Sequence, residues 1–236
     1  KQKSGIEKNN MDLSIITVSW NVVDKLKNSI KAIKENSAGV KYEIIIIDND
    51  SKDGTPEIIA KEFPEIRLIS NKLNRGFAAA NNQGLAISSG GYVLFLNPDM
   101  RVMPGTLKIM LDFMHVNQDV GISSCKLVNE RGDVLNEVRP LPTVWSQLAV
   151  VLKLTHIFPF LLKNFEIKNI DLNLEQDVPQ VRGSFFMVNR KMIEEIGSWD
   201  ESFFIWFEDV DWCKRARDAG WRVVYTPKTA CIDYVG

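Results

Sequence analysis

The stretch EIIII at Glu43–Ile47 is an unbroken run of isoleucines behind one acid. An apolar run without polar alternation is typical of a parallel strand that is covered on both faces of its sheet. The run LSIITV at Leu13–Val18 has the same character, and Asp24–Asn36 between the two runs carries apolar residues at helical spacing. Together the three segments predict a β-α-β unit with a parallel sheet.

The same alternation continues towards the C-terminus. Thr55 and Pro56 are predicted to begin a helix, with Thr as its N-cap and Pro at its first position. Ile66–Ile69 and YVLFL at Tyr92–Leu96 are predicted strands, and the Ala-rich segment Gly76–Ser89 is the predicted helix between them. The order βαβαβαβ predicts an α/β fold with a single Rossmann-like, mostly parallel sheet flanked by helices.

Beyond residue 99 the pattern is less regular. We expect helices at Pro104–Val116 and Glu208–Ala219, strands at Val120–Ser124, Val181–Val188 and Trp221–Tyr225, and a hairpin turn at Glu130–Asp133. The chain shows no repeat or low-complexity linker, so one domain is expected over residues 12–236. Its two halves would be a nucleotide-binding half at 12–99 and a smaller acceptor-side β/α half at 100–236. The polar residues 1–11 are interpreted as a disordered tail or tag remnant.

Composition narrows the function classes. The 236 residues are 45% hydrophobic with a net charge of −1, which excludes wholesale disorder and argues against broad nucleic-acid binding. Cys125, Cys213 and Cys231 are scattered and form no CxxC pair, so we expect buried thiols in a reducing compartment. With only two histidines, His115 and His156, any metal site or general base must rest on carboxylates.

Membrane signals are weak. The N-terminus has no apolar core of a signal peptide, and no stretch reaches a clean transmembrane length. Val144–Phe165 comes nearest, but charged residues and Pro159 interrupt it. We favour a core helix pair for this segment over a membrane-surface element, and a cytoplasmic location for the protein.

Polar residues follow each of the first four predicted strands. They are Ser19–Asn21, Asp48–Ser51, Asn71–Gly76 and Asn97–Asp99. Asn, Asp and Gly are also ordinary turn residues, but four such strand ends in succession favour a ligand site at the carboxyl edge of the sheet. Because GxGxxG and GxxxxGK[ST] are both absent, dinucleotide oxidoreductases and P-loop kinases are disfavoured.

Two acidic positions suggest chemistry. Asp99 at a strand end is able to hold Mg²⁺ or Mn²⁺, which in turn holds a diphosphate. In Phe204–Asp211, aromatic residues lead into three acids at a predicted helix start. The helix dipole accounts for one or two of these acids. Apolar walls raise a carboxyl pKa towards that of a general base, and aromatic faces such as that of Trp206 suit sugar rings.

Six ordered segments carry a resemblance to a known family. They are IITVSWN (15–21), IIIIDNDSKDGT (44–55), NRGFAAANNQG (74–84), YVLFLNPD (92–99), VRGSFFMVNR (181–190) and WDESFFIWFEDVDWCKRARDAGW (199–221). With these segments the chain resembles glycosyltransferase family 2, whose members have the GT-A fold and use nucleotide-sugar donors. Within it the chain is most similar to the bacterial and archaeal rhamnosyltransferase-like branch.

The resemblance implies a role for each matching position. Asp48 would bind the nucleotide base, in a pocket lined by Thr17, Ser19, Asn21 and Asp50. The ribose and phosphates would lie near Gly76, Phe77 and Asn81. Asn97 and Asp99 stand at the family's DXD motif, with Asp99 as the metal ligand. Arg182, Gly183 and Trp206 would border the sugar and acceptor, and Glu208 and Asp209 match the ED motif, with Asp209 as general base.

One departure concerns the metal. The family usually has a histidine after its last strand, where this chain has Asp233, so Asp233 is the expected replacement ligand. Relatives also commonly continue beyond the position of Gly236, so we expect a chain that is truncated at its C-terminus.

The implied reaction is an inverting, metal-assisted sugar transfer. The donor would be a UDP- or dTDP-sugar with Mn²⁺ or Mg²⁺, and the acceptor a glycan or a lipid-linked glycan at the inner face of the membrane. Peripheral membrane contact is then expected, with Val144–Phe165 as the candidate segment. Two alternatives stay open: a non-catalytic nucleotide-sugar-binding protein and, less favoured, a sugar nucleotidyltransferase.

Overall fold

The structure is a computed structural model that describes residues 11–135, 138, 140–142, 148 and 170–234. The interpretations of the N-terminal tail and of Val144–Phe165 fall outside these residues, apart from Met11 and Leu148.

The first half of the chain forms the expected parallel sheet. Its strands are β1 (Leu13–Ser19), β2 (Tyr42–Asp48), β3 (Arg67–Ser70) and β4 (Tyr92–Leu96). They lie side by side in the order β3-β2-β1-β4 and every pair is parallel. The apolar runs that predicted them are buried along their length in β1 and β4, so the covered-strand interpretation is confirmed.

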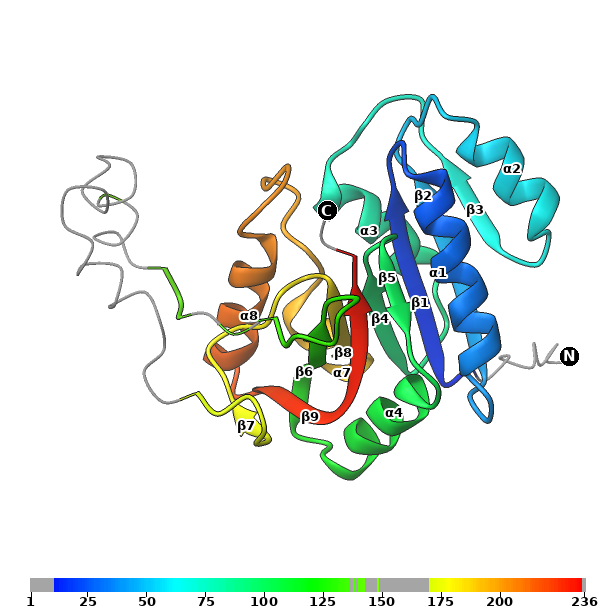
Figure 1. The fold of residues 1–236 in the computed structure, drawn as a ribbon. Coiled ribbons are helices and arrows are strands. Elements are labelled where there is room, and N and C mark those ends of the chain that lie inside the picture. The colour runs from blue at the N-terminus through cyan, green and yellow to red at the C-terminus, as the bar shows by residue number, and fades with distance from the viewer. Residues whose placement is uncertain (1–10, 136–137, 139, 143–147, 149–169, 235–236) are drawn as a thin grey trace, which may run out of the picture.

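The second half extends the same sheet with mixed strand directions. It contributes β5 (Met100–Val102), β6 (Val120–Val128), β7 (Gln176–Asp177), β8 (Phe185–Asn189) and β9 (Arg222–Asp233). β8 lies antiparallel between β4 and β6, and β9 runs parallel to β6 and antiparallel to β5 and β7. The described residues thus form one nine-stranded sheet, which Figure 1 shows running from β3 through β1 to β9.

Helices cover both faces of this sheet. The apolar core on one face includes residues of α1 (Val23–Asn36), α2 (Thr55–Glu62) and α4 (Thr106–Val116). The core on the other face includes residues of α3 (Phe77–Ile87), α7 (Arg190–Ile196) and α8 (Glu208–Asp218). All three cysteines are buried and free, as expected. Among the described residues, no helix has the length and apolarity needed to cross a bilayer.

Several predicted boundaries are wrong, among them the following three. Thr55 is the first helical residue rather than the N-cap of α2, because Gly54 takes the cap position with φ +79° and the Thr55 hydroxyl donates to Asp53. The strand predicted at Val181–Val188 begins only at Phe185. The last strand runs on to Asp233, with a register shift at Pro227, whose missing N–H cannot join the ladder.

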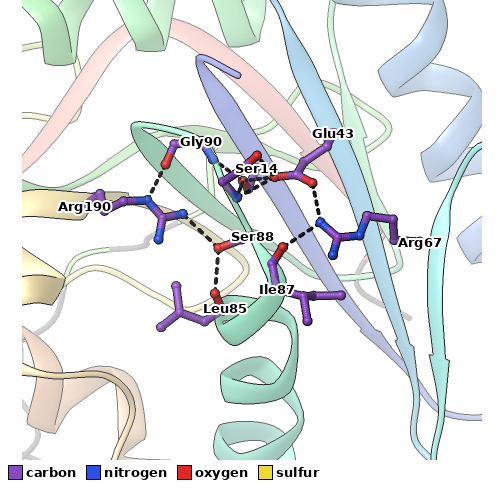
Figure 2. Close-up of polar contacts among 9 residues, drawn as sticks. Ser14, Glu43, Arg67, Leu85, Ile87, Ser88, Gly90 and Arg190 are labelled. Atoms are coloured by element: carbon purple, nitrogen blue, oxygen red, sulfur yellow. Dashed lines mark hydrogen bonds and ion pairs between the residues drawn. The ribbon is translucent and has the colours of Figure 1, made fainter. Parts of the chain in front are cut away.

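A cluster of polar side chains links the strands and loops at the amino edge of the sheet (Figure 2). The Glu43 carboxylate accepts hydrogen bonds from the Ser14 hydroxyl (2.7 Å), the Ser89 N–H (2.6 Å) and the Arg67 guanidinium (2.9 Å). The Ser14 hydroxyl oxygen accepts from the Gly90 N–H at 2.8 Å, and Arg190 donates to the Gly90 carbonyl. Burial alone would raise the pKa of Glu43, but these hydrogen bonds outweigh it and lower the pKa. The opposite, carboxyl edge carries the candidate site.

Candidate active site

The loops after β1 and β2 are tied to each other at the carboxyl edge. The Asn21 N–H donates to the Ser51 hydroxyl (2.9 Å), and the Asn21 side-chain oxygen accepts from the Lys52 N–H (2.6 Å). Asn21 and Asp50 both have left-handed backbones, with φ +55° and +70°. Asn21 is exposed and its side chain holds the loop, while the Asp50 carboxylate lies 2.5 Å from the Lys52 ammonium.

Thr17, Ser19 and Asp48 form a buried polar floor between these loops. Ser19 and Asp48 are register partners at the ends of β1 and β2, and Thr17 lies on the same strand face as Ser19. Asp48 Oδ2 accepts from the Ser51 N–H at 3.1 Å. Asp48 Oδ1 and Ser19 Oγ are buried and have no hydrogen-bond partner within the described part of the chain. Such oxygens cost about 1–3 kcal/mol each while unsatisfied.

The loop after β3 is organised by Asn49, a residue to which the sequence analysis gave no role. Its amide donates to Asn74 Oδ1 (2.8 Å) and to the Gly76 carbonyl (3.2 Å), and its oxygen accepts from the Arg75 N–H (3.0 Å). In the sequence, the only signal for this role is an asparagine that follows a predicted strand. Asn49 therefore holds the Asn71–Gly76 loop against the polar floor.

Gly76 and Phe77 join this loop to the segment before α8. The Phe77 N–H donates to the Phe204 carbonyl at 2.8 Å. Gly76 has φ +81°, and a Cβ atom there would lie 2.5 Å from the same carbonyl oxygen, so glycine is required. The Phe77 ring packs edge-on against Trp199, and the buried Asn81 amide donates to the Phe77 carbonyl at 3.1 Å. Phe77 and Asn81 thus support the helix start rather than reach into an open pocket.

Two carboxylates meet where β4 leads into β5 and β9 ends. Asn97 follows β4, and its N–H donates to the Ser184 carbonyl at 3.0 Å. The Tyr234 N–H donates to the Asp99 carbonyl at 3.2 Å, which sets Asp99 beside Asp233. Burial and, next, the nearby charge of Asp99 raise the pKa of Asp233.

A basic side chain approaches each of these carboxylates. The Lys25 ammonium on α1 lies 3.8 Å from Asp99 Oδ2, and the Arg182 guanidinium lies 3.9 Å from Asp233 Oδ2. Lys25 was missed in the sequence analysis, because nothing local connects it to a strand end 74 positions later.

The donor set at Asp99 and Asp233 fits a hard divalent cation. Mg²⁺ is commonly held by one or two carboxylates together with substrate phosphates and water. Within the described residues, no group of three His, Cys, Asp or Glu side chains gathers into a metal site. A cation at this pair therefore needs oxygens from a bound diphosphate.

Glu208 and Asp209 begin α8 beside the Arg182–Gly183 dipeptide. Asp209 Oδ2 accepts from the Gly183 N–H at 3.1 Å, and Oδ1 accepts from the Val210 N–H at 2.8 Å. Burial raises the pKa of Asp209 despite these hydrogen bonds. Burial also raises the pKa of Glu208, to about 7, and Asp209 adds to that rise. Glu208 is only 6% exposed, whereas Asp209 is partly exposed and can be reached by a substrate.

The aromatic residues before these acids face outward. Trp206 is 74% exposed, and Phe204, Ile205 and Phe207 are also exposed. The apolar wall expected around the carboxyls is therefore not made by these side chains, and the raised pKa values come from burial of the carboxyls in the fold. The structure brings Gly183, Arg182, Asp209 and Asp233 together and leaves the Trp206 side chain exposed.

Comparison with known proteins was made for sequence and for structure. The family model described as glycosyl transferase family 2 matches residues 14–197. An N-acetylglucosaminyl-diphospho-decaprenol L-rhamnosyltransferase of Mycobacterium tuberculosis is 26% identical, over 81% of this chain and 66% of its own length. A low-salt glycan biosynthesis hexosyltransferase of Haloferax volcanii is 28% identical, over 87% of this chain and 62% of its own length. The chain thus spans slightly under two thirds of the length of these relatives.

A solved structure of similar fold is the mannosyltransferase PcManGT from Pyrobaculum calidifontis in complex with GDP-Man and Mn²⁺. It aligns with a TM-score of 0.69 and 19% identity, over 96% of this chain and 58% of the other. This likeness, together with the mixed sheet and its flanking helices, confirms the expected α/β fold of the GT-A type.

Proposed function

The chain belongs to glycosyltransferase family 2, and on that premise we propose that it moves a sugar from a nucleoside-diphosphate donor to a hydroxyl of a glycan or lipid-linked acceptor, with inversion. One observation carries the proposal. Arg182 reaches the carboxylate of Asp233 while the N–H of the next residue, Gly183, binds Asp209. Asp233, which would lie near the diphosphate, and Asp209, the candidate base, are thereby held by adjacent residues. An in-line displacement needs both groups at fixed positions around the sugar.

In this proposal the donor lies along the carboxyl edge. Asp48 and Ser19 form the buried floor of the proposed nucleoside pocket. Thr17, Asn21 and Asp50 are the other residues proposed to line the base pocket. The segment with Gly76, Phe77 and Asn81 is proposed to lie near the ribose and phosphates, and Asn97 stands beside Asp99 at the DXD motif. UDP- and dTDP-sugars are the donors we would test first.

Asp209 is the proposed general base. It takes the proton of the acceptor hydroxyl, whose oxygen forms a bond to the anomeric carbon as the bond to the diphosphate breaks on the opposite side. A pKa raised by burial makes Asp209 a better proton acceptor, and the Gly183 N–H keeps its carboxylate oriented. Glu208 is buried next to Asp209 and has the supporting role in this pair of acids.

The diphosphate would lie near Arg182 and Lys25, whose charges offset the charge of the leaving group. Asp99 and Asp233 would hold Mn²⁺ or Mg²⁺ at the same place. When bound, such a cation neutralises charge that grows on the diphosphate.

The test of the base is Asp209→Asn. Since general-base help is worth about 10²–10⁴-fold, turnover should fall by that factor while donor affinity is kept. Asp218→Asn, at the exposed far end of the same helix, is the matched control and should change neither quantity. Turnover close to that of the unmodified chain in Asp209→Asn would overturn the assignment.

The alternative is a non-catalytic nucleotide-sugar-binding protein. It is favoured by one observation: Asp99 and Asp233 already face Lys25 and Arg182. A panel of nucleotide sugars with Mn²⁺ or Mg²⁺ separates the two functions, since only an enzyme releases nucleoside diphosphate when an acceptor is present. A nucleotidyltransferase stays disfavoured, because Ser19–Val23 after β1 has no glycine-rich basic loop.

The name of the mycobacterial relative includes a decaprenol-linked substrate. We extend the proposal to a lipid-linked acceptor for this chain, which would place the reaction at the cytoplasmic face of a membrane.

A further inference from the structure

Within the described residues, exposed aromatic side chains follow β1 and precede α8. In the part of the chain that the structure describes, the exposed Phe, Trp and Tyr residues are Trp20, after β1, and Phe204, Trp206 and Phe207, before α8. With Ile205, the last three make up a continuous apolar segment, which we call the aromatic rim (Phe204–Phe207). The rim is therefore a feature of the site edge rather than ordinary scattered exposure.

The backbone holds the rim in its outward position. Trp206 and Phe207 have φ of +69° and +68°, a left-handed conformation that is unusual for bulky residues and marks functional sites. At one end the Phe204 carbonyl is bound by the Phe77 N–H, and at the other Glu208 is buried at the start of α8. Both ends are thus anchored while the side chains between them are exposed.

Basic residues lie next to the rim. The contact between Gly76 and the Phe204 carbonyl brings the Lys72–Arg75 segment beside Phe204. Lys72, Leu73 and Arg75 in that segment are all exposed, Leu73 by 62%. The two acids upstream of the rim, Asp200 and Glu201, are also exposed, and Glu201 accepts a hydrogen bond from the Asn82 amide at 2.9 Å. The edge therefore combines exposed aromatic side chains with exposed cations.

The chemistry of this edge favours a bilayer over another protein chain. With about 200 Å² per large side chain, the exposed fractions of the four rim residues correspond to roughly 450 Å² of apolar surface. Trp and Phe next to Lys and Arg are the residues that settle at the boundary between lipid headgroups and acyl chains.

We propose that the aromatic rim inserts into the headgroup region of an anionic bilayer, with Lys72 and Arg75 against the lipid phosphates. Membrane insertion itself does not depend on the proposed function, but its consequence for the acceptor does. Trp206 precedes Asp209 by three residues, so their Cα atoms are at most about 11 Å apart. The base then works close to the membrane, and the reacting hydroxyl belongs to a sugar near the lipid end of the acceptor.

Vesicle binding tests the rim without donor or acceptor. The intact chain should bind phosphatidylcholine–phosphatidylglycerol vesicles more strongly than pure phosphatidylcholine vesicles. Phe204→Ser/Trp206→Ser should lower that affinity by about tenfold or more. The matched control is Val116→Ser/Leu174→Ser, which removes apolar side chains that are 81% and 60% exposed elsewhere and should bind as the intact chain does. Lys72→Gln/Arg75→Gln should remove mainly the preference for phosphatidylglycerol.

Fluorescence quenching gives a second readout that does not depend on a destabilising change. Vesicles with brominated acyl chains should quench part of the tryptophan emission of the intact chain. Trp206→Phe, which keeps an aromatic residue, should bind vesicles and lose that quenched part.

Two results would overturn the proposal: an intact chain that binds neither vesicle, or a Phe204→Ser/Trp206→Ser chain that binds as well as the intact one. The second result would put the membrane contact on another surface. A chain that binds vesicles through the rim but never releases nucleoside diphosphate would keep this inference and refute the proposed function.

Discussion

Gly76→Ala is the perturbation that best tests how the two halves of the site are joined. Gly76 has a left-handed backbone, and an added Cβ would lie 2.5 Å from the Phe204 carbonyl oxygen. That oxygen also accepts the Phe77 N–H hydrogen bond. The substitution therefore adds backbone strain and also forces apart the loop after β3 and the segment that leads into Glu208 and Asp209.

The magnitude follows from three contributions. A non-glycine residue at the φ of 81° and ψ of 174° that Gly76 adopts costs about 1–3 kcal/mol. Loss of the Phe77 hydrogen bond adds about 1 kcal/mol, and displacement of backbone by an overpacked methyl adds about 1–3 kcal/mol. The free energy of unfolding should fall by about 3–7 kcal/mol, which corresponds to roughly 6–28 °C in melting temperature at about 2–4 °C per kcal/mol for a chain of this size.

Gly39→Ala is the matched control. Gly39 also has a positive φ, +79°, but an added Cβ there would have no heavy atom within 4 Å. It should lose only a backbone contribution of about 1–2 kcal/mol, or roughly 2–8 °C. Thermal unfolding by circular dichroism compares the two variants, and turnover should fall only in Gly76→Ala. Equal losses of melting temperature would refute the claim that the contact with Phe204 holds the site together.

Two further predictions concern buried carboxyls. Because burial raises the pKa of Glu208 to about 7, the folded chain keeps a proton that the unfolded chain releases, and stability should fall by up to about 3 kcal/mol as pH rises from about 4.5 to 7. Urea unfolding of Glu208→Gln should lack this fall, and an unchanged pH slope would contradict the assignment. Glu43→Gln should lower the free energy of unfolding by about 2–3 kcal/mol at pH 7 and by less at pH 3. The reason is that the lowered pKa of Glu43 gives the folded chain stability that is lost as pH falls through the native pKa. The control Glu130→Gln, on an exposed turn, should show neither effect.

The parallel half could be predicted from the sequence because its signals are local. The apolar runs of β1, β2 and β4 and the helical spacing of α1 each identify an element without reference to any other. β5 and β7 are three and two residues long and have no such signature. They are strands because β9 pairs with them, which is a tertiary event.

The family resemblance names the expected site residues, but the contacts between them depend on the tertiary structure. Asp99, Arg182, Asp209 and Asp233 lie in separate motifs, and only the sheet order places β9 beside β5 and Gly183 beside α8. Lys25 reaches Asp99 for the same reason, since α1 packs over the sheet beside β5.

The sequence by itself determined the α/β alternation and the family, because apolar runs, helical spacing and the family motifs are properties of the chain. Its two histidines also led to the prediction that the chemistry rests on carboxylates. Tertiary structure decided which charges face one another and which side chains remain exposed. The aromatic residues before Glu208 are the clearest case. Their composition predicted an apolar wall, but the left-handed turn at Trp206 and Phe207 points them outward, and backbone geometry of that kind is set by the contacts at both ends of a segment.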